Sequence, residues 1–199
     1  MFPDLLKQNL SGIVDLPAEA VSALQAHYDL LVRWNRVLNL TSVRTLEEAV
    51  LRHYCESVFL AVHLPAGQLR VADVGSGGGF PGLPVAVVRA DCTVTLIESH
   101  QRKAVFLKEA ARSLSNVRVL ARRAEDVTEV FDHVISRAVS YDDLMPTLKR
   151  LGPVAYLLTG AEAPSPELGF AWEAAIPLPW GKQRFLRTGR AIEGPCCSL

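Results

Sequence analysis

The sequence has no long hydrophobic run, and this absence limits the kind of protein it encodes. No apolar stretch reaches the ~18–20 residues that a membrane-spanning helix needs. The N-terminal MFPDLLKQNL lacks the basic start and apolar centre of a signal peptide. Hydrophobic residues still make up 49% of the 199 residues, and charged residues 21%, which argues against global disorder. We therefore expect a globular, cytoplasmic protein with one substantial core.

Cysteine is scarce, and its spacing matches no zinc cluster. We therefore expect no metal site. The first two cysteines lie in apolar, helix-like or strand-edge contexts, so buried thiols in a reducing compartment are the simplest interpretation. The cysteines are Cys55, Cys92, Cys196 and Cys197.

Positive charge is not in excess, since Lys plus Arg and Asp plus Glu both number 21. Nucleic-acid-binding proteins are usually basic, so any RNA contact must come from local patches. Residues 181–190 hold four basic side chains and no acid, and residues 102–123 hold seven basic side chains against Glu109 alone. A solvated edge strand and a charged outer helix face explain these two runs about as well.

The N-terminal part of the chain shows helical periodicity. Residues 17–38 place Val21, Leu24, Tyr28, Leu31 and Leu38 on one face. A second helix is predicted over 46–64, where Thr45 and Glu48 form a capping-box pattern, and a loop over 39–44. We expect residues 1–65 to form a helical element that packs on the remaining domain, residues 66–199.

From residue 69 the pattern changes to short apolar strands that alternate with helices. This alternation predicts an α/β fold: a Rossmann-like, mostly parallel sheet with helices on both faces. A last pair of strands is expected after residue 160, with residues 183–188 as the best candidate. The predicted strands are 69–74, 93–98, 117–121, 132–136 and 154–159, and the predicted helices lie near 81–90, 101–114 and 141–151.

A dense run of glycines follows the first of these strands. Residues 69–84 read LRVADVGSGGGFPGLP, and glycines this dense let the main chain come very close to a ligand. A phosphate-binding P-loop ends in Gly-Lys-Ser/Thr, and residues 69–102 contain no Lys. The sequence therefore excludes a P-loop.

Two other ligands remain. A dinucleotide is compatible with Gly77, Gly79 and Gly82, which satisfy G-x-G-x-x-G, although two prolines crowd the helix start where N–H groups should face a pyrophosphate. S-adenosylmethionine has no phosphate, and it needs an acid at the end of the second strand for its ribose. Glu98 fits that place, and Asp73 before the loop would favour the cationic methionine part. The structural alternative is that Asp73 caps the loop and Glu98 begins the next helix.

The sequence as a whole resembles the small-subunit ribosomal RNA guanine-N7 methyltransferases, the glucose-inhibited division protein B family. The resemblance extends from about residue 28 to 160 and rests on six motifs in order. They are WNRVLNLTSVR (34–44), RHYCES (52–57), DVGSGGGFPGLP (73–84), TLIES (95–99), RRAED (122–126) and FDHVISRAVS (131–140). The resemblance implies methyl transfer from S-adenosylmethionine to N7 of one guanosine in 16S ribosomal RNA.

The resemblance also implies roles for particular residues. Glu98 would face the cofactor's ribose, Ala124 and Glu125 would lie beside its adenine, and Arg137 would sit at the cofactor and the target base. One departure is Thr159, which stands where the family commonly has Lys. The predicted cofactor-binding residues are Asp73, Gly75, Gly77, Phe80, Glu98, Ala124, Glu125 and Arg137.

The residue pattern agrees with this chemistry, because guanine N7 carries a lone pair and no proton, so its methylation requires no general base. No acid–base pair or triad stands out, and the Asp/Asn-Pro-Pro-aromatic tetrad of exocyclic-amine methyltransferases is absent. Arg137 is the predicted catalytic residue; its alternative is an ion pair with Asp132 or Glu125. The predicted RNA-binding residues are Asn39, Thr41, Arg44, Arg52 and His53. Their alternative is structural, since Asn39 and Thr41 are good turn and cap formers and His53 can be a hydrogen-bonded helix histidine.

Three other functions stay open at this point. The chain could methylate another RNA or a small molecule, or transfer hydride with a dinucleotide. A non-catalytic cofactor- or RNA-binding protein of the same fold is the third, and Thr159 in place of a lysine is the feature that favours it. The expected partner is small-subunit ribosomal RNA or the small ribosomal subunit, with no membrane.

Overall fold

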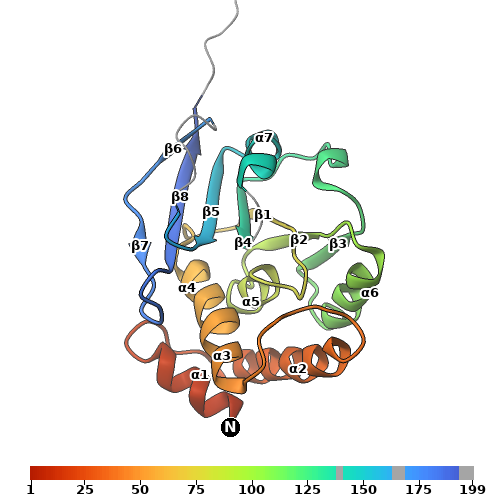
Figure 1. The fold of residues 1–199 in the computed structure, drawn as a ribbon, viewed down its shortest axis with the longest axis vertical. Coiled ribbons are helices and arrows are strands. Elements are labelled where there is room, and N and C mark those ends of the chain that lie inside the picture. Colours follow the sequence, from red (N-terminus) through yellow and green to blue (C-terminus); the bar gives the residue numbers. More distant parts are fainter. Residues whose placement is uncertain (138–140, 163–168, 193–199) are drawn as a thin grey trace, which may run out of the picture.

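The structure is a computed structural model that describes residues 1–137, 141–162 and 169–192. Its centre is an eight-stranded sheet with the order β3-β2-β1-β4-β5-β8-β6, and β7 pairs with β8 beside this path (Figure 1). The strands are β1 Arg70–Val74, β2 Thr93–Ile97, β3 Val117–Leu120, β4 His133–Arg137, β5 Val154–Thr159, β6 Phe170–Trp172, β7 Ile176–Pro177 and β8 Phe185–Ala191.

The sheet is parallel from β3 to β5 and antiparallel beyond it. β1 pairs in parallel with β2 and β4, and these pair in parallel with β3 and β5. β8 runs antiparallel to β5, β6 and β7. The predicted Rossmann-like α/β fold is confirmed. Where a last pair of strands was predicted, the structure has three strands, β6, β7 and β8. The prediction missed one because β6 and β7 are too short to show a sequence pattern.

Helices cover both faces of the sheet unequally (Figure 1). The residues of α4, α5 and α6 share one hydrophobic cluster with α1 and α2, whereas α7 packs in the cluster on the other face. The helices are α1 Phe2–Leu10, α2 Ala18–Asn35, α3 Leu46–Ala49, η1 Val50–Cys55, α4 Glu56–His63, α5 Gly82–Val88, α6 Gln101–Ala110, η2 Ala124–Asp126 and α7 Tyr141–Leu151.

The helix predicted over 46–64 is present but not uniform. Thr45 Oγ1 accepts from the main-chain N–H of Glu48 at 3.1 Å, so the predicted N-cap is confirmed. Between α3 and α4 the helix widens into the π-helical turn η1. Such turns are rare and frequently occur at functional sites. Here η1 holds His53, and Glu56 follows directly at the start of α4.

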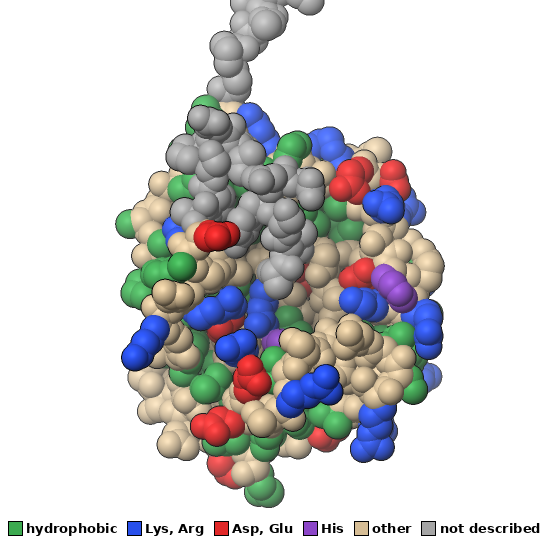
Figure 2. Space-filling view, in the orientation of Figure 1, with side chains coloured by type: hydrophobic (Ala, Val, Ile, Leu, Met, Phe, Trp, Pro, Cys, Tyr) green, Lys and Arg blue, Asp and Glu red, His purple; other side chains and the backbone are tan. Residues whose placement is uncertain are grey.

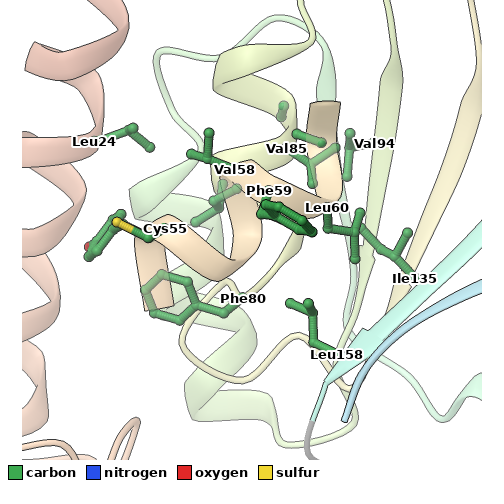
Figure 3. Close-up of a cluster of buried hydrophobic side chains, with 14 of the residues drawn as sticks. Leu24, Cys55, Val58, Phe59, Leu60, Phe80, Val85, Val94, Ile135 and Leu158 are labelled. Carbon is green, nitrogen blue, oxygen red and sulfur yellow. The ribbon is translucent and has the colours of Figure 1, made fainter. Parts of the chain in front are cut away.

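Apolar burial joins the N-terminal helices to the sheet. Figure 3 shows Leu24 of α2, Val58 and Leu60 of α4 and Ile135 of β4 among the side chains of this core. A fully buried aliphatic side chain contributes about 1.5–3 kcal/mol, so the helices are held mainly by this cluster. Cys55 and Cys92 are buried free thiols, whereas Cys196 and Cys197 lie outside the described residues.

The connection from α4 to β1 is held by one side chain. Arg89 donates to the main-chain oxygens of Ala61, Leu64, Pro65 and Gly67. The predicted division between residues 1–65 and 66–199 falls in this connection and stays a prediction. Across the part of the chain that the structure describes, no helix is long and apolar enough to span a bilayer.

Candidate active site

The glycine loop lies at the carboxyl edge of the sheet, between β1 and α5. Gly75, Gly77 and Gly79 have φ angles of 75°, 52° and 90°, in the left-handed region that favours glycine. A Cβ on Gly79 would lie 2.4 Å from Leu83 Cδ1 and 3.2 Å from His27 Nε2. The loop is therefore a tight main-chain cradle, without room for side chains where it meets α2 and α5.

Asp73 lies beneath this loop, fully buried. Its Oδ2 accepts from the main-chain N–H of Gly82 at 3.0 Å, and its Oδ1 has no partner among the described residues. Burial raises the pKa of Asp73 to about 7. Asp73 thus anchors the start of α5, as the structural alternative expected, and its predicted contact with the cofactor stays a prediction.

Glu98 follows β2 at the neighbouring strand end. Its Oε2 accepts from the main-chain N–H of Gly77 at 2.9 Å and its Oε1 from that of His100 at 2.7 Å. The carboxylate therefore faces the glycine loop at the carboxyl edge, where open α/β sheets bind ligands. A main-chain cradle beside a carboxylate, with no cation for a phosphate in the loop, fits S-adenosylmethionine.

A tether from the N-terminal helices to the loop was missed by the sequence analysis. His27 of α2 donates from Nε2 to the main-chain oxygen of Gly78 at 3.0 Å, and Tyr54 donates its hydroxyl to His27 Nδ1 at 3.0 Å. Burial lowers the pKa of His27 to about 4, so the ring is neutral in one tautomer. A polar residue on the apolar face of the 17–38 helix was the available signal.

Arg137 ends β4 and lies in a cluster of polar side chains. Its Nη1 donates to His53 Nδ1 at 2.6 Å, and its Nε lies 3.7 Å from Glu56 Oε2. Glu56 also accepts two hydrogen bonds from Arg184, which follows β7 in the chain. The ion-pair partner of Arg137 is therefore Glu56, and the alternative pairings with Asp132 or Glu125 are wrong.

His53 is fixed on both ring nitrogens. Since Nδ1 accepts from Arg137, Nε2 carries the proton and donates to Thr41 Oγ1 at 2.6 Å. The ring stacks on Phe80 of the glycine loop, with centroids 4.5 Å apart. Burial and the neighbouring Arg137 lower the pKa of His53 to about 3. His53 and Thr41 therefore hold Arg137 next to the loop.

The remaining predicted cofactor residues lie in the helical turn η2, which follows β3 in the chain. Ala124 and Glu125 form η2, and Arg150 of α7 donates to the main-chain oxygens of Ala124 at 2.7 Å, of Glu125 at 3.2 Å and of Val127. The Glu125 side chain is exposed. Arg150 was missed by the sequence analysis, because nothing in its helical context distinguishes it from a surface arginine.

The predicted RNA-binding residues divide into two groups. Asn39, Arg44 and Arg52 are exposed, whereas Thr41 is half-buried and His53 buried. The side chain that closes the 39–44 loop is that of Asn35, whose Oδ1 accepts from the main-chain N–H groups of residues 40 and 41. Figure 2 shows Lys and Arg side chains grouped near the middle of one face, with acidic side chains between them.

The basic run 181–190 is not a solvated patch as a whole. Arg184 pairs with the buried Glu56, and Arg187 donates from Nε to Thr159 Oγ1 at 3.0 Å. Thr159 itself is buried and donates to the main-chain oxygen of Gly160. Within residues 1–137, 141–162 and 169–192, no group of three or more His, Cys, Asp or Glu side chains forms a candidate metal site.

Solved structures share this fold. An S-adenosylmethionine-dependent methyltransferase from Aquifex aeolicus matches with a TM-score of 0.56 at 20% identity, covering 73% of this chain and 93% of that one. The fibrillarin pre-rRNA processing protein of Methanococcus jannaschii matches with a TM-score of 0.56 at 15% identity, covering 71% and 76%. The fold is that of the Rossmann-like S-adenosylmethionine-dependent methyltransferases.

The sequence comparisons identify the family within that class. A family model described as rRNA small subunit methyltransferase G matches residues 20–157. Proteins named ribosomal RNA small subunit methyltransferase G are similar: that of Methylobacillus flagellatus is 43% identical over 69% of this chain and 68% of its own length. That of Chromobacterium violaceum is 41% identical over 68% and 66%.

The chain therefore belongs to the rRNA small subunit methyltransferase G family. This confirms the family predicted from the sequence, the methyltransferase class and S-adenosylmethionine as the methyl donor. The match spans about two thirds of the length of the curated relatives, and the family model ends before β8.

Proposed function

We propose that this protein methylates N7 of a guanosine in 16S ribosomal RNA, in the cytoplasm, where the small ribosomal subunit is its partner. One observation supports this proposal above the others. Arg137 lies at the carboxyl edge beside the glycine loop, and the two histidines nearby, His27 and His53, are neutral and bonded at both ring nitrogens. Guanine N7 has a lone pair and no proton. Its methylation therefore requires that the guanine is held in position, and it requires no residue that accepts a proton.

The chain offers distinct groups for each part of the methyl donor. When bound, S-adenosylmethionine supplies the methyl group. The main chain at Gly75 and Gly77 and the ring of Phe80 would hold its methionine part, and the Glu98 carboxylate would hold its ribose. Ala124 and Glu125, fixed by Arg150, would border its adenine. Asp73 supports this site through its hydrogen bond with the main-chain N–H of Gly82, which fixes the end of the loop.

Arg137 orients the target nucleotide. Because N7 must stay open to the incoming methyl group, the guanidinium contacts O6 of the guanine or the adjacent phosphate, where it forms directed, charge-assisted hydrogen bonds. His53 and Thr41 fix Arg137 for this task, and the exposed Asn39, Arg44 and Arg52 line the RNA-facing edge beside it.

The test uses small ribosomal subunits from cells that lack the native modification. The subunits are incubated with the protein and methyl-labelled S-adenosylmethionine, and the RNA is digested to nucleosides. Label in 7-methylguanosine is the expected result. Label in another nucleoside would keep the methyltransferase and overturn the N7 specificity, and cofactor binding without any label would favour the non-catalytic alternative. The Arg137→Ala variant, folded but without methyl transfer, identifies the site.

A further inference from the structure

Glu56 is a buried acid at the start of α4 to which the sequence analysis gave no role. Its side chain is 3% exposed. It accepts two hydrogen bonds from one guanidinium: Arg184 Nε to Oε1 at 3.0 Å and Arg184 Nη2 to Oε2 at 2.7 Å. Its Oε2 also lies 3.7 Å from Arg137 Nε. Burying a carboxylate is costly unless it is paired. Here the partners of Glu56 are Arg137, at the end of β4, and Arg184, directly before β8.

The direction of these contacts matters for Arg137. Its Nη1 is bonded to His53 and its Nε faces Glu56, and both partners come from the single stretch of η1 and α4. Contacts on two of the three guanidinium nitrogens fix the plane of the group. The bidentate pair with Arg184 in turn fixes the carboxylate, because an Arg–carboxylate fork has one preferred geometry. The orientation of Arg137 thus depends on a side chain 47 residues further along the chain.

We infer that Glu56 and Arg184 are positioning residues for Arg137, so the segment that leads into β8 completes the active site. This inference rests on the proposed role of Arg137. Arg184 lies beyond residues 20–157, which the family model matches. Glu56 and Arg184 bond to each other, and Glu56 lies beside the Arg137 guanidinium, so we expect their effect to fall on target orientation and not on cofactor binding.

The experiment measures kcat, the Kd of S-adenosylmethionine and thermal stability for Glu56→Gln, Glu56→Asp and Arg184→Met, on subunits that lack the modification. Glu56→Gln and Arg184→Met are expected to lower kcat about 10–100-fold, as a misplacement of about 1 Å does. The Kd of S-adenosylmethionine should stay within about twofold, which corresponds to a change in binding free energy below 1 kcal/mol. Glu56→Asp keeps the charge and should recover part of kcat. Glu173→Gln, which breaks the exposed pair with Arg190, is the matched control without effect.

The outcomes separate the inference from the proposed function. Unchanged kcat in Glu56→Gln or Arg184→Met overturns the inference. So does a joint loss of kcat, cofactor affinity and stability that Glu56→Asp does not relieve, since that pattern belongs to a structural pair. Arg137→Lys tests the proposed role of Arg137, on which the inference rests. Full activity in this variant overturns that role. If Glu56→Gln does not fold, Arg184→Met decides, because the Arg184 side chain is 29% exposed and that of Glu56 only 3%.

Discussion

The two halves of the carboxyl edge are built in opposite ways. In the glycine-loop half, main-chain atoms form the surface. The buried side chains of His27 and Asp73 fix these atoms by hydrogen bonds to the main chain of Gly78 and Gly82. In the Arg137 half, side chains form the surface, and the charged groups Glu56 and Arg184 hold one another. The first half depends on close packing and the second on charge and direction. Changes in the first should therefore reduce stability and cofactor binding together, and changes in the second should leave cofactor binding unchanged and reduce target binding or turnover.

The largest effect is expected in the loop half, from Gly82→Ala. The added Cβ would lie 2.4 Å from Leu96 Cδ2 and 2.6 Å from Asp73 Oδ2, so both side chains must move. Overpacking of this kind costs about 1–3 kcal/mol, and it displaces the carboxylate that anchors the loop. Urea denaturation and calorimetric titration with S-adenosylmethionine measure the two losses. In Gly160→Ala, where the new Cβ would meet only a main-chain oxygen at 4.0 Å, stability should stay near that of the wild type.

The next effect tests the tether between the helices and the loop. His27→Leu removes the hydrogen bonds that the ring makes with the oxygen of Gly78 and the hydroxyl of Tyr54, each of which contributes about 0.5–1.5 kcal/mol net. Because one of these groups belongs to the loop, the Kd of S-adenosylmethionine should also rise, by about tenfold for each 1.4 kcal/mol lost at the loop. Tyr54→Phe removes only the outer hydrogen bond and should cost less. An unchanged Kd in His27→Leu would show that the loop holds its shape without α2.

The pH dependence of stability sharpens the comparison between the two histidines and Asp73. The pKa of His27 is lowered to about 4 and that of His53 to about 3, from 6.5. The unfolded chain therefore binds protons that the folded chain does not, and these two groups reduce stability as the pH falls below 6.5. The pKa of Asp73 is raised from 3.8 to about 7, so this group acts in the opposite direction and reduces stability as the pH rises toward 7.

The measurement is the free energy of unfolding between pH 7 and pH 5. Each histidine contributes a slope of up to ~1.4 kcal/mol per pH unit in this range. His27→Gln should remove one such contribution, so the difference between wild type and variant isolates the histidine from Asp73. Parallel curves for the two proteins would mean that His27 has the same pKa in the folded and the unfolded chain.

The smallest effect belongs to the exposed rim of the Arg137 half. Arg52 forms an exposed ion pair with Glu48 at 3.3 Å, so Arg52→Gln should change stability by less than about 1 kcal/mol. If Arg52 contacts the RNA backbone, the slope of log K against log salt should fall by about 0.7–0.9. Arg70→Gln removes an equally exposed arginine at the amino end of β1 and should leave that slope unchanged.

Those parts of the fold and site that depend on local pattern could be predicted from the sequence. The alternation of strands and helices gave the parallel sheet, and the glycine spacing with Glu98 at the end of β2 placed the loop at the carboxyl edge. The position of Arg137 beside the loop was predictable from its place at the end of β4, together with the family motif around it, whereas its role stays a prediction.

The parts that depend on distant pairs could not. Glu56 reads as one polar residue in an apolar helix, and its partner Arg184 lies 128 residues away in a run that looks like a solvated strand. His27 reads as an interruption of an apolar face, although its ring joins two elements of the site. The π-helical turn η1 leaves no mark that a helical periodicity would detect. In each case the role of the residue depends on which elements contact one another in the folded chain, and the sequence of a single element does not show this.

The separation of Glu56 and Arg184 also sets an order of events during synthesis. A ribosome adds about 5–20 residues per second, so Glu56 leaves the exit tunnel on the order of ten seconds before the arginine that neutralises it. Throughout that interval, docking α4 on the sheet would bury a carboxylate without this partner. The nascent chain therefore finishes its charged site only when the segment before β8 arrives, and a chain interrupted earlier retains the glycine loop but not the complete support of Arg137.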